Sequence, residues 1–343
     1  MAKFRKCSKS IGDFFKLNQG LEGGYVLLRS VLITGGSGYL GSYLTRFMIE
    51  NSDMNLRIFD LKIGDKFERY IQKNSARIEL IKGDVRNLNQ VIDATSEVDY
   101  VVHLAAITSV PDSIKHPKLT EDVNLHGTRN LLLACKDQEI SKFILASSAA
   151  VYGDNQNLPL MEEEAGKFEL ISPYAESKFA NESDLTEAVS ANMDKIVLRF
   201  FNIYGVNNLI EEKSNSVTSI FTDLMKQGKT PTIFGDGTST RDFIHLSDVC
   251  RAILMSLESA QYDGDAQIFN IASGRKTTML ELIEQLNKSM KTRNPGWESI
   301  RPEFREQRDG DILHSQASIT RAKEILGWEP KITLFSGLDE MLD

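Results

Sequence analysis

The chain has 343 residues, of which 41% are hydrophobic and 26% are charged, and its formal net charge is −8. These values are typical of a soluble globular protein and exclude a collagen-like or disordered chain. The acidic balance excludes a sequence-wide basic surface for nucleic acid. The sequence also lacks the run of about 18 apolar residues that a membrane helix needs.

Residues 1–25 precede the first predicted strand and form an N-terminal extension, either an extra packed helix or a functional arm. Charged residues interrupt its apolar cluster, so a signal peptide is not expected. Cys7, Cys135 and Cys250 are widely spaced and lack a CxxC motif, which excludes a disulfide framework and a zinc site. We therefore expect a cytoplasmic protein without a metal.

Short β-branched runs alternate with helical patterns over the first 200 residues. This alternation predicts an α/β fold, a doubly wound parallel (Rossmann) sheet with ligands at the carboxyl ends of its strands. The predicted strands are Val31–Thr34, Leu56–Asp60, Ile78–Lys82, Val98–Leu104, Phe143–Ser147 and Ile196–Phe200. Leu119–Gln138 and Pro173–Asn192 predict long helices between them. Beyond residue 200, denser glycine and charge predict a second, smaller α/β substrate lobe.

The first predicted strand runs into a glycine-rich turn in which Gly36, Gly38 and Gly41 fit the pattern G-x-G-x-x-G. Glycine lets the backbone approach a pyrophosphate, and the amides at the start of the following helix supply partial positive charge. The next strand ends at Asp60, about 20 residues further on, where a carboxylate can accept both ribose hydroxyls. Because that carboxylate repels a 2′-phosphate, we predict NAD as the cofactor; a turn-capping role for Asp60 is the alternative.

Three residues form the predicted catalytic set. Ser148 follows the fifth strand, and Tyr174 and Lys178 are four residues apart on the next helix, which places them on one face. A free phenol titrates near ~10, and a nearby ammonium, helped by an oxidised nicotinamide ring, favours the phenolate. Such a set suits the removal of a proton from a sugar hydroxyl while hydride leaves the same carbon.

Together these residues resemble the extended short-chain dehydrogenase/reductase family, and within it the nucleotide-sugar epimerases. The resemblance extends from about Val26 to Trp328. It rests on the glycine turn, Gly83-Asp84-Val85, His103-Leu104-Ala105-Ala106, Asn124, Ser147-Ser148, and Tyr174 with Lys178. It implies a cofactor site made of Gly35, Gly38, Tyr39, Leu40, Gly41, Asp60, Asp84, Val85, Leu104, Ala105, Ala106, Asn124, Tyr174 and Lys178. His103 itself is interpreted as a core histidine with satisfied hydrogen bonds.

The resemblance also assigns substrate contacts in the second half of the chain. It places Asn202 near the nucleotide-sugar diphosphate and Phe234 against the uracil. Two guanidinium groups suit a diphosphate, and a carboxylate suits ribose hydroxyls. The complete predicted substrate set is Ser148, Asn202, Ile233, Phe234, Arg241, Arg308, Asp311 and Ser315.

The reaction type follows from Ala149 and Ala150, which stand where related 4,6-dehydratases carry an Asp-Glu pair and related decarboxylases a glutamate. Without a carboxylate there, the resemblance implies epimerisation at C4 of a UDP-hexose. In that mechanism Tyr174 takes the O4 proton, hydride passes to NAD, and the 4-keto sugar rotates before hydride returns to its opposite face. The small Ser315 leaves room for an N-acetyl group, favouring UDP-GlcNAc/UDP-GalNAc over UDP-Glc/UDP-Gal.

Two alternatives remain: an NAD(P)-dependent 4-keto-sugar-nucleotide reductase, and a non-catalytic nucleotide-binding protein of the same family. The expected NAD-binding domain comprises residues 26–200 and 241–272, and the expected nucleotide-sugar-binding lobe comprises 201–240 and 273–343. The resemblance implies a homodimer formed through the two long predicted helices. The expected partner of the protein is a UDP-sugar substrate, and neither nucleic acid nor a membrane is an expected partner.

Overall fold

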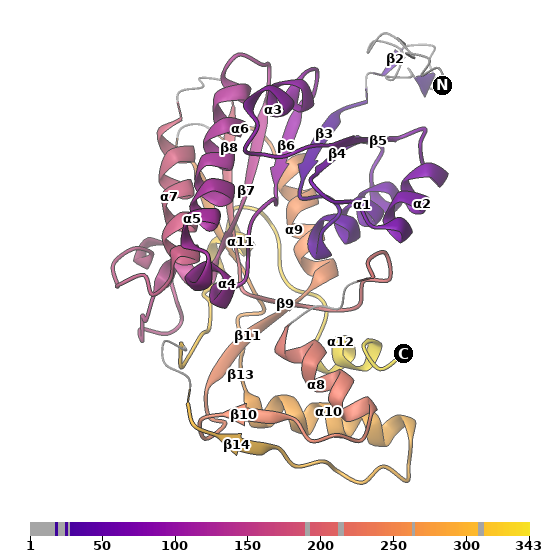
Figure 1. Ribbon diagram of the computed structural model, residues 1–343, viewed down its shortest axis with the longest axis vertical. Coiled ribbons are helices and arrows are strands. Elements are labelled where there is room, and N and C mark those ends of the chain that lie inside the picture. Colours follow the sequence, from indigo (N-terminus) through magenta and orange to yellow (C-terminus); the bar gives the residue numbers. More distant parts are fainter. Residues whose placement is uncertain are drawn as a thin grey trace, which may run out of the picture.

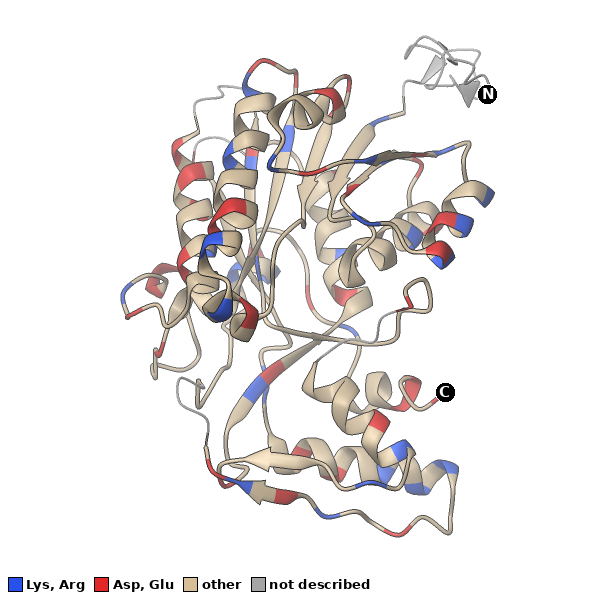
Figure 2. Ribbon diagram, in the orientation of Figure 1, with Lys and Arg blue, Asp and Glu red and all other residues tan. Residues whose placement is uncertain are grey.

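A computed structural model describes residues 28–188, 193–211, 216–262, 265–307 and 312–343. It also gives the backbone of two short antiparallel strands, β1 (Asn18–Gln19) and β2 (Tyr25–Val26). Figure 1 shows a large α/β part above a smaller part that contains the C-terminus. Acidic and basic residues are interspersed along the ribbon of both parts (Figure 2).

The large part is built on a seven-stranded sheet in which every neighbouring pair is parallel. Each of the six predicted strands overlaps one of its strands, which confirms the doubly wound α/β fold. The strand order reverses between β3 and β6, and such sheets bind ligands at that point. In spatial order the strands are β12 (Gln267–Ile271), β8 (Asp194–Phe200), β7 (Lys142–Ser148), β6 (Tyr100–His103), β3 (Ser30–Thr34), β4 (Asn55–Asp60) and β5 (Ile78–Lys82).

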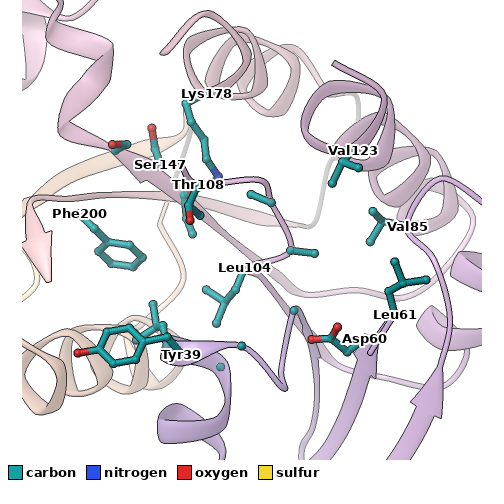
Figure 3. A pocket seen from close by; sticks show the side chains of 18 of the residues that line it. Tyr39, Asp60, Leu61, Val85, Leu104, Thr108, Val123, Ser147, Lys178 and Phe200 are labelled. Carbon is teal, nitrogen blue, oxygen red and sulfur yellow. Dashed lines mark hydrogen bonds between the residues drawn. The ribbon is translucent and has the colours of Figure 1, made fainter. Parts of the chain in front are cut away.

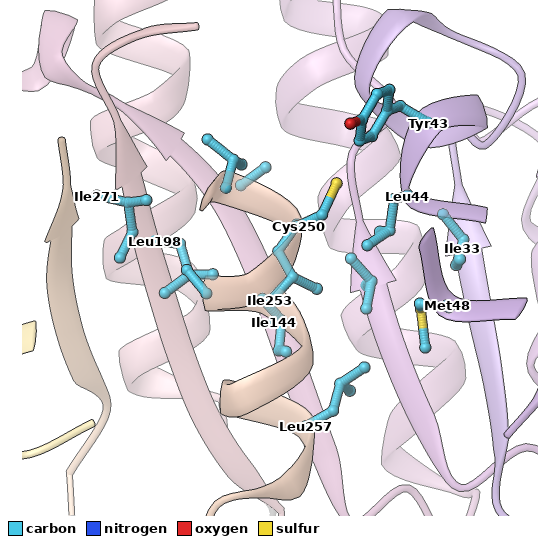
Figure 4. Packing of buried hydrophobic residues seen from close by; sticks show 14 of the residues in the cluster. Ile33, Tyr43, Leu44, Met48, Ile144, Leu198, Cys250, Ile253, Leu257 and Ile271 are labelled. Carbon is cyan, nitrogen blue, oxygen red and sulfur yellow. The ribbon is translucent and has the colours of Figure 1, made fainter. Parts of the chain in front are cut away.

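Helices cover both faces of this sheet (Figure 1), so its strands are apolar on both sides. On one face, Cys250 packs with Tyr43 and Leu44 in the hydrophobic core (Figure 4). Cys250 and Cys135 are buried free thiols, and Cys7 lies outside the described residues. The helices of the large part are α1 (Tyr39–Asn51), α2 (Asp65–Lys73), α3 (Leu88–Thr95), α4 (Val110–Lys115), α5 (Pro117–Thr120), α6 (Gly127–Lys136), α7 (Pro173–Glu187) and α9 (Leu246–Glu258).

The start of α7 positions the predicted catalytic helix. Ser172 caps it, because its hydroxyl accepts a hydrogen bond from the Ala175 amide at 3.2 Å, and Pro173 occupies the first helical position. Both are strong helix-start signals. As a result Tyr174 lies in the first turn. The other long predicted helix is divided into α5, a π-helical turn at Glu121–His126, and α6.

The smaller part has its own hydrophobic core, which contains Tyr204, Phe221 and Leu282. A three-stranded sheet connects it to the large part. In this sheet β11 (Thr240–His245) pairs with β9 (Asn202–Tyr204) and with β13 (Lys276–Thr278), whereas β12 belongs to the main sheet. No helix in the described ranges is both long and apolar enough to span a membrane. The remaining elements are β10 (Thr232–Phe234), β14 (Glu303–Arg305), α8 (Val217–Lys226), α10 (Met279–Arg293), α11 (Thr320–Glu324) and α12 (Leu334–Glu340).

Candidate active site

A cavity of about 530 Å³ lies at the carboxyl ends of β3, β4, β6 and β7 (Figure 3). Every predicted cofactor residue except Asn124 lines it. The glycine turn and the start of α1 form one wall, and Tyr174 and Lys178 lie in another part of the lining. The parallel sheet therefore brings together residues that lie more than a hundred positions apart in the sequence, at the point where its strand order reverses.

Three glycines of the turn, Gly35, Gly36 and Gly41, have no room for a side chain. Gly35 adopts a φ of +68°, and a Cβ there would lie 2.7 Å from the backbone nitrogen of Ala105. A Cβ on Gly41 would lie 2.2 Å from the carbonyl oxygen of Gly35. Gly36 is absent from the cavity lining, and its missing Cβ makes room for Ile58 instead. Exposed backbone at the start of a helix fits the pyrophosphate of a dinucleotide.

Two acidic residues, Asp60 and Asp84, line the part of the cavity where the glycine motif predicts the adenosine half of the cofactor. Asp60 accepts a hydrogen bond from the Ser37 amide at 2.9 Å, so it ties the glycine turn to β4 while lining the cavity. Capping and ribose binding are therefore compatible roles for Asp60. Asp84 is paired with Arg86, whose guanidinium hydrogen bonds lower the pKa of this carboxyl group.

Asn124 lies outside the cavity and is fully buried in the π-helical turn. Its amide holds the backbone of Ile107 through two hydrogen bonds, of 2.8 and 3.1 Å, and donates to Ser177 of α7 at 3.0 Å. It thus orders the loop after β6 against the catalytic helix. His103 contacts two threonine hydroxyls, Thr34 and Thr128, and burial lowers its pKa to about 3, as expected of a neutral core histidine.

The predicted catalytic side chains converge at one end of the cavity. Lys178 Nζ donates to the Ala146 carbonyl at 2.7 Å and lies 5.9 Å from the centroid of the Tyr174 ring. Burial lowers the pKa of Lys178 to about 8, against the opposing charge of Glu182. Burial also raises the pKa of Tyr174, and its hydrogen bond with Ser148 opposes this shift. For the Tyr174 phenol, burial therefore outweighs the hydrogen bond with Ser148.

A second cavity, of about 320 Å³, meets the first at Ser148 and Tyr174. Its lining includes the predicted substrate residues Asn202, Arg241 and Ser315. Arg241 donates from its guanidinium to the Thr240 carbonyl at 2.9 Å. The Ser148 and Tyr174 hydroxyls thus stand between the two cavities.

Two further predicted substrate residues lie elsewhere in the structure. Ile233 is buried in the core of the smaller part, and Phe234 lies beside it on β10; neither lines the two cavities. Arg308 and Asp311 lie outside the described residues. Their assignments stay predictions.

The structure also adds residues that the sequence reasoning did not single out. Thr108 lines both cavities, and His314 lines the second beside Ser315, with its Nδ1 3.2 Å from the Thr240 hydroxyl. The sequence feature that could have identified Thr108 is its position shortly after β6, two residues beyond the predicted cofactor residue Ala106. Within the part of the chain that the structure describes, no cluster of three His, Cys, Asp or Glu side chains could hold a metal ion.

Comparisons with known proteins point to the same chemistry. Residues 31–272 match the NAD dependent epimerase/dehydratase family. A putative UDP-glucose 4-epimerase from Methanocaldococcus jannaschii is 31% identical over 317 residues, which cover 91% of this chain and 97% of that protein.

Two solved structures extend the likeness to the fold. A UDP-N-acetylglucosamine 4-epimerase from Methanobrevibacter ruminantium M1, in complex with UDP-N-acetylmuramic acid, is similar with a TM-score of 0.80 and 31% identity, covering 92% of this chain and 97% of that one. The UDP-glucose 4-epimerase of Thermotoga maritima with UDP-glucose has a TM-score of 0.77 and 31% identity, covering 91% and 97%.

Proposed function

Because the chain belongs to the NAD dependent epimerase/dehydratase family, we propose that it inverts C4 of a UDP-hexose through a 4-keto intermediate. One observation carries the proposal: Ser148 and Tyr174 line both cavities, at the place where a cofactor and a sugar would meet. The full-length similarity to UDP-sugar 4-epimerases supports the same reaction.

The cofactor residues fit NAD, because the glycine turn is open to a pyrophosphate and Asp60 lines the cavity. When bound, NAD supplies a carbon that takes a hydride from the sugar C4 and gives it back. Tyr174 removes the proton from O4 and later returns it, and Ser148 hydrogen-bonds the same oxygen. The buried Lys178 ammonium, held by the Ala146 carbonyl, favours the phenolate form.

The lining of the second cavity favours epimerisation over elimination. Ala149 and Ala150 occupy the positions that follow Ser148 there, so they supply no acid or base for the removal of water at C5 and C6. The 4-keto sugar must then rotate within the cavity while its diphosphate stays bound. Asn202 and Arg241, which line the same cavity, are suited to hold that diphosphate.

Substrate choice depends on the small Ser315 in this lining. It is 6% exposed, and its amide is fixed by the Thr240 carbonyl at 3.2 Å. A hydroxymethyl side chain leaves space beneath the sugar 2-substituent that a larger residue would fill. We therefore propose UDP-GlcNAc and UDP-GalNAc as the preferred substrates, with UDP-Glc and UDP-Gal as secondary ones.

Ser315→Tyr should remove N-acetyl turnover selectively. The expected result is a fall of about 10²-fold in kcat/KM for UDP-GlcNAc with only a few-fold change for UDP-Glc, because the added ring occupies the volume of the acetamido group. Steady-state kinetics on both sugars measure this. Ser315→Ala, which keeps the space open, is the control, and an equal loss on both sugars would mean that the gate lies elsewhere.

A proton-NMR time course with UDP-sugars and no added cofactor tests the reaction type. Interconversion of C4 epimers by the purified protein is expected, because a cofactor that is regenerated each cycle need not be supplied. Turnover that depends on added reductant would instead support a 4-keto-sugar reductase. No turnover with NAD bound would support a non-catalytic role.

We further propose a homodimer formed through α6 and α7. Leu133 on α6 is 52% exposed, and Arg129 of α6 pairs with Asp184 of α7 at 2.7 Å, which holds the two helices side by side. A cavity of about 300 Å³ lined by Leu132 and Leu133 adds apolar surface there. Sedimentation should show a dimer that Leu133→Asp weakens. The two-domain division and the cytoplasmic location stay predictions.

A further inference from the structure

A buried ion pair lies one helical turn beyond Lys178 on α7. Glu182 is 4% exposed and Arg199, on β8, is 2% exposed. Arg199 binds both carboxylate oxygens, with Nε–Oε1 at 3.0 Å and Nη2–Oε2 at 2.7 Å. The Ser147 hydroxyl also donates to Glu182 Oε1. The buried carboxylate thus accepts three hydrogen bonds, two of them from one guanidinium in a bidentate arrangement.

The sheet register builds this arrangement. Ser147 and Arg199 are directly paired on the neighbouring strands β7 and β8, so their side chains leave the same face of the sheet, the one that α7 covers. Ser147 precedes Ser148, and Arg199 lies three residues before Asn202. Arg199 also donates to the Tyr152 hydroxyl at 2.9 Å. The ion pair therefore joins the segments that carry the active-site residues.

In the described structure, the titratable side chains that interact with the Lys178 ammonium are His103, Tyr174 and Glu182. His103 faces it from β6 and is neutral, because burial holds its pKa near 3. Tyr174 and Glu182 precede and follow it by one turn on α7, and Arg199 stands behind Glu182 on β8. Burial favours the neutral amine, and the charge of Glu182 opposes that effect.

We propose that Glu182 is a positioning residue that keeps Lys178 protonated beside Tyr174, and that Arg199 and Ser147 hold the Glu182 carboxylate in place for this purpose. A buried lysine would otherwise lose its proton easily. The use of the ammonium in catalysis rests on the proposed epimerase reaction. Its protonation is a property of the fold and can be measured without turnover.

Lysine labelled with ¹³C at the ε-carbon gives a direct test by NMR titration of the intact protein. The Lys178 signal is identified by its loss in Lys178→Arg. We expect Glu182→Gln to lower the titration midpoint of Lys178 by about one pH unit, a tenfold change in the protonation equilibrium. Glu176→Gln removes an exposed carboxylate from the same helix and should leave the midpoint unchanged. An equal midpoint in Glu182→Gln and the parent protein would overturn the proposal.

Glu182→Gln leaves Arg199 buried opposite a neutral amide, which destabilises the fold. The double variant Glu182→Gln/Arg199→Gln removes both charges. It should still show a lowered midpoint, by less than in Glu182→Gln because the Arg199 cation is gone as well, in a better-folded protein. If neither variant folds, the titration midpoint of Lys178 in the parent protein is the test. A midpoint below neutral pH would show that Glu182 does not maintain the ammonium.

Kinetics provide a second readout. In the parent, kcat should fall as pH rises through about 8, where Lys178 loses its proton. In Glu182→Gln this alkaline fall should move to lower pH while KM changes little, whereas a merely structural role would lower kcat at every pH. A parent without epimerase activity but with the NMR shift intact would refute the proposed function and leave this inference standing.

Discussion

Tyr174→Phe should lose about 10²- to 10⁴-fold in kcat and keep its NAD, because this is the usual contribution of a general acid–base group. The substitution removes only the hydroxyl that exchanges the O4 proton. The ring stays in its buried place in the first turn of α7, so the cavity keeps its shape. Turnover by NMR and the absorbance of NAD that co-elutes with the protein measure the two quantities.

Tyr70→Phe is the matched control, since Tyr70 lies on α2 and lines neither cavity. It should leave both turnover and NAD content unchanged. A Tyr174→Phe protein within tenfold of the parent kcat would contradict the role of the phenol. A loss of NAD together with activity would instead mean that Tyr174 acts through binding.

Gly41→Ala should abolish NAD retention and lower the melting temperature. Its Cβ would lie 2.2 Å from the Gly35 carbonyl oxygen and 2.6 Å from the Gly36 Cα, and both are backbone atoms. The turn can relieve this clash only by opening, which displaces the amides that would face a pyrophosphate. Overpacking of this kind costs about 1–3 kcal/mol in folding free energy. Co-elution of NAD and differential scanning fluorimetry report the two effects.

Gly64→Ala is the control for this variant. Gly64 caps α2 at a φ of −80°, which any residue adopts, and no atom lies within 4 Å of its missing Cβ. NAD content should match the parent, and the melting temperature should fall less than in Gly41→Ala, by the small cost of alanine at a helix N-cap. A Gly41→Ala protein that retains NAD as well as the parent would show that the cofactor does not rest on the glycine turn.

The sheet was predictable because its strands are short, apolar on both faces and bounded by turn residues, as in Val31–Thr34. The start of α7 at Pro173 was equally predictable. Asn124 was harder to interpret, since its contacts depend on a π-helical turn that periodicity does not reveal. The partners of β11 also depend on long-range pairing that local pattern does not contain.

The electrostatics of the site were the least accessible to sequence reasoning. The spacing of Tyr174 and Lys178 predicted their shared face, and the structure places them together. The spacing did not reveal how strongly burial opposes charge on both side chains. Nor did it reveal the role of Glu182 on the same helix, because its contact with Arg199 requires the register of β7 and β8.

The most direct test of the account uses UDP-GlcNAc that carries deuterium at C4, incubated with the purified protein in ordinary water without added cofactor. A hydride that is taken and returned within one site keeps the label, so UDP-GalNAc with deuterium still at C4 is the predicted product. Exchange of the label with solvent, or a requirement for added reductant, would contradict the mechanism.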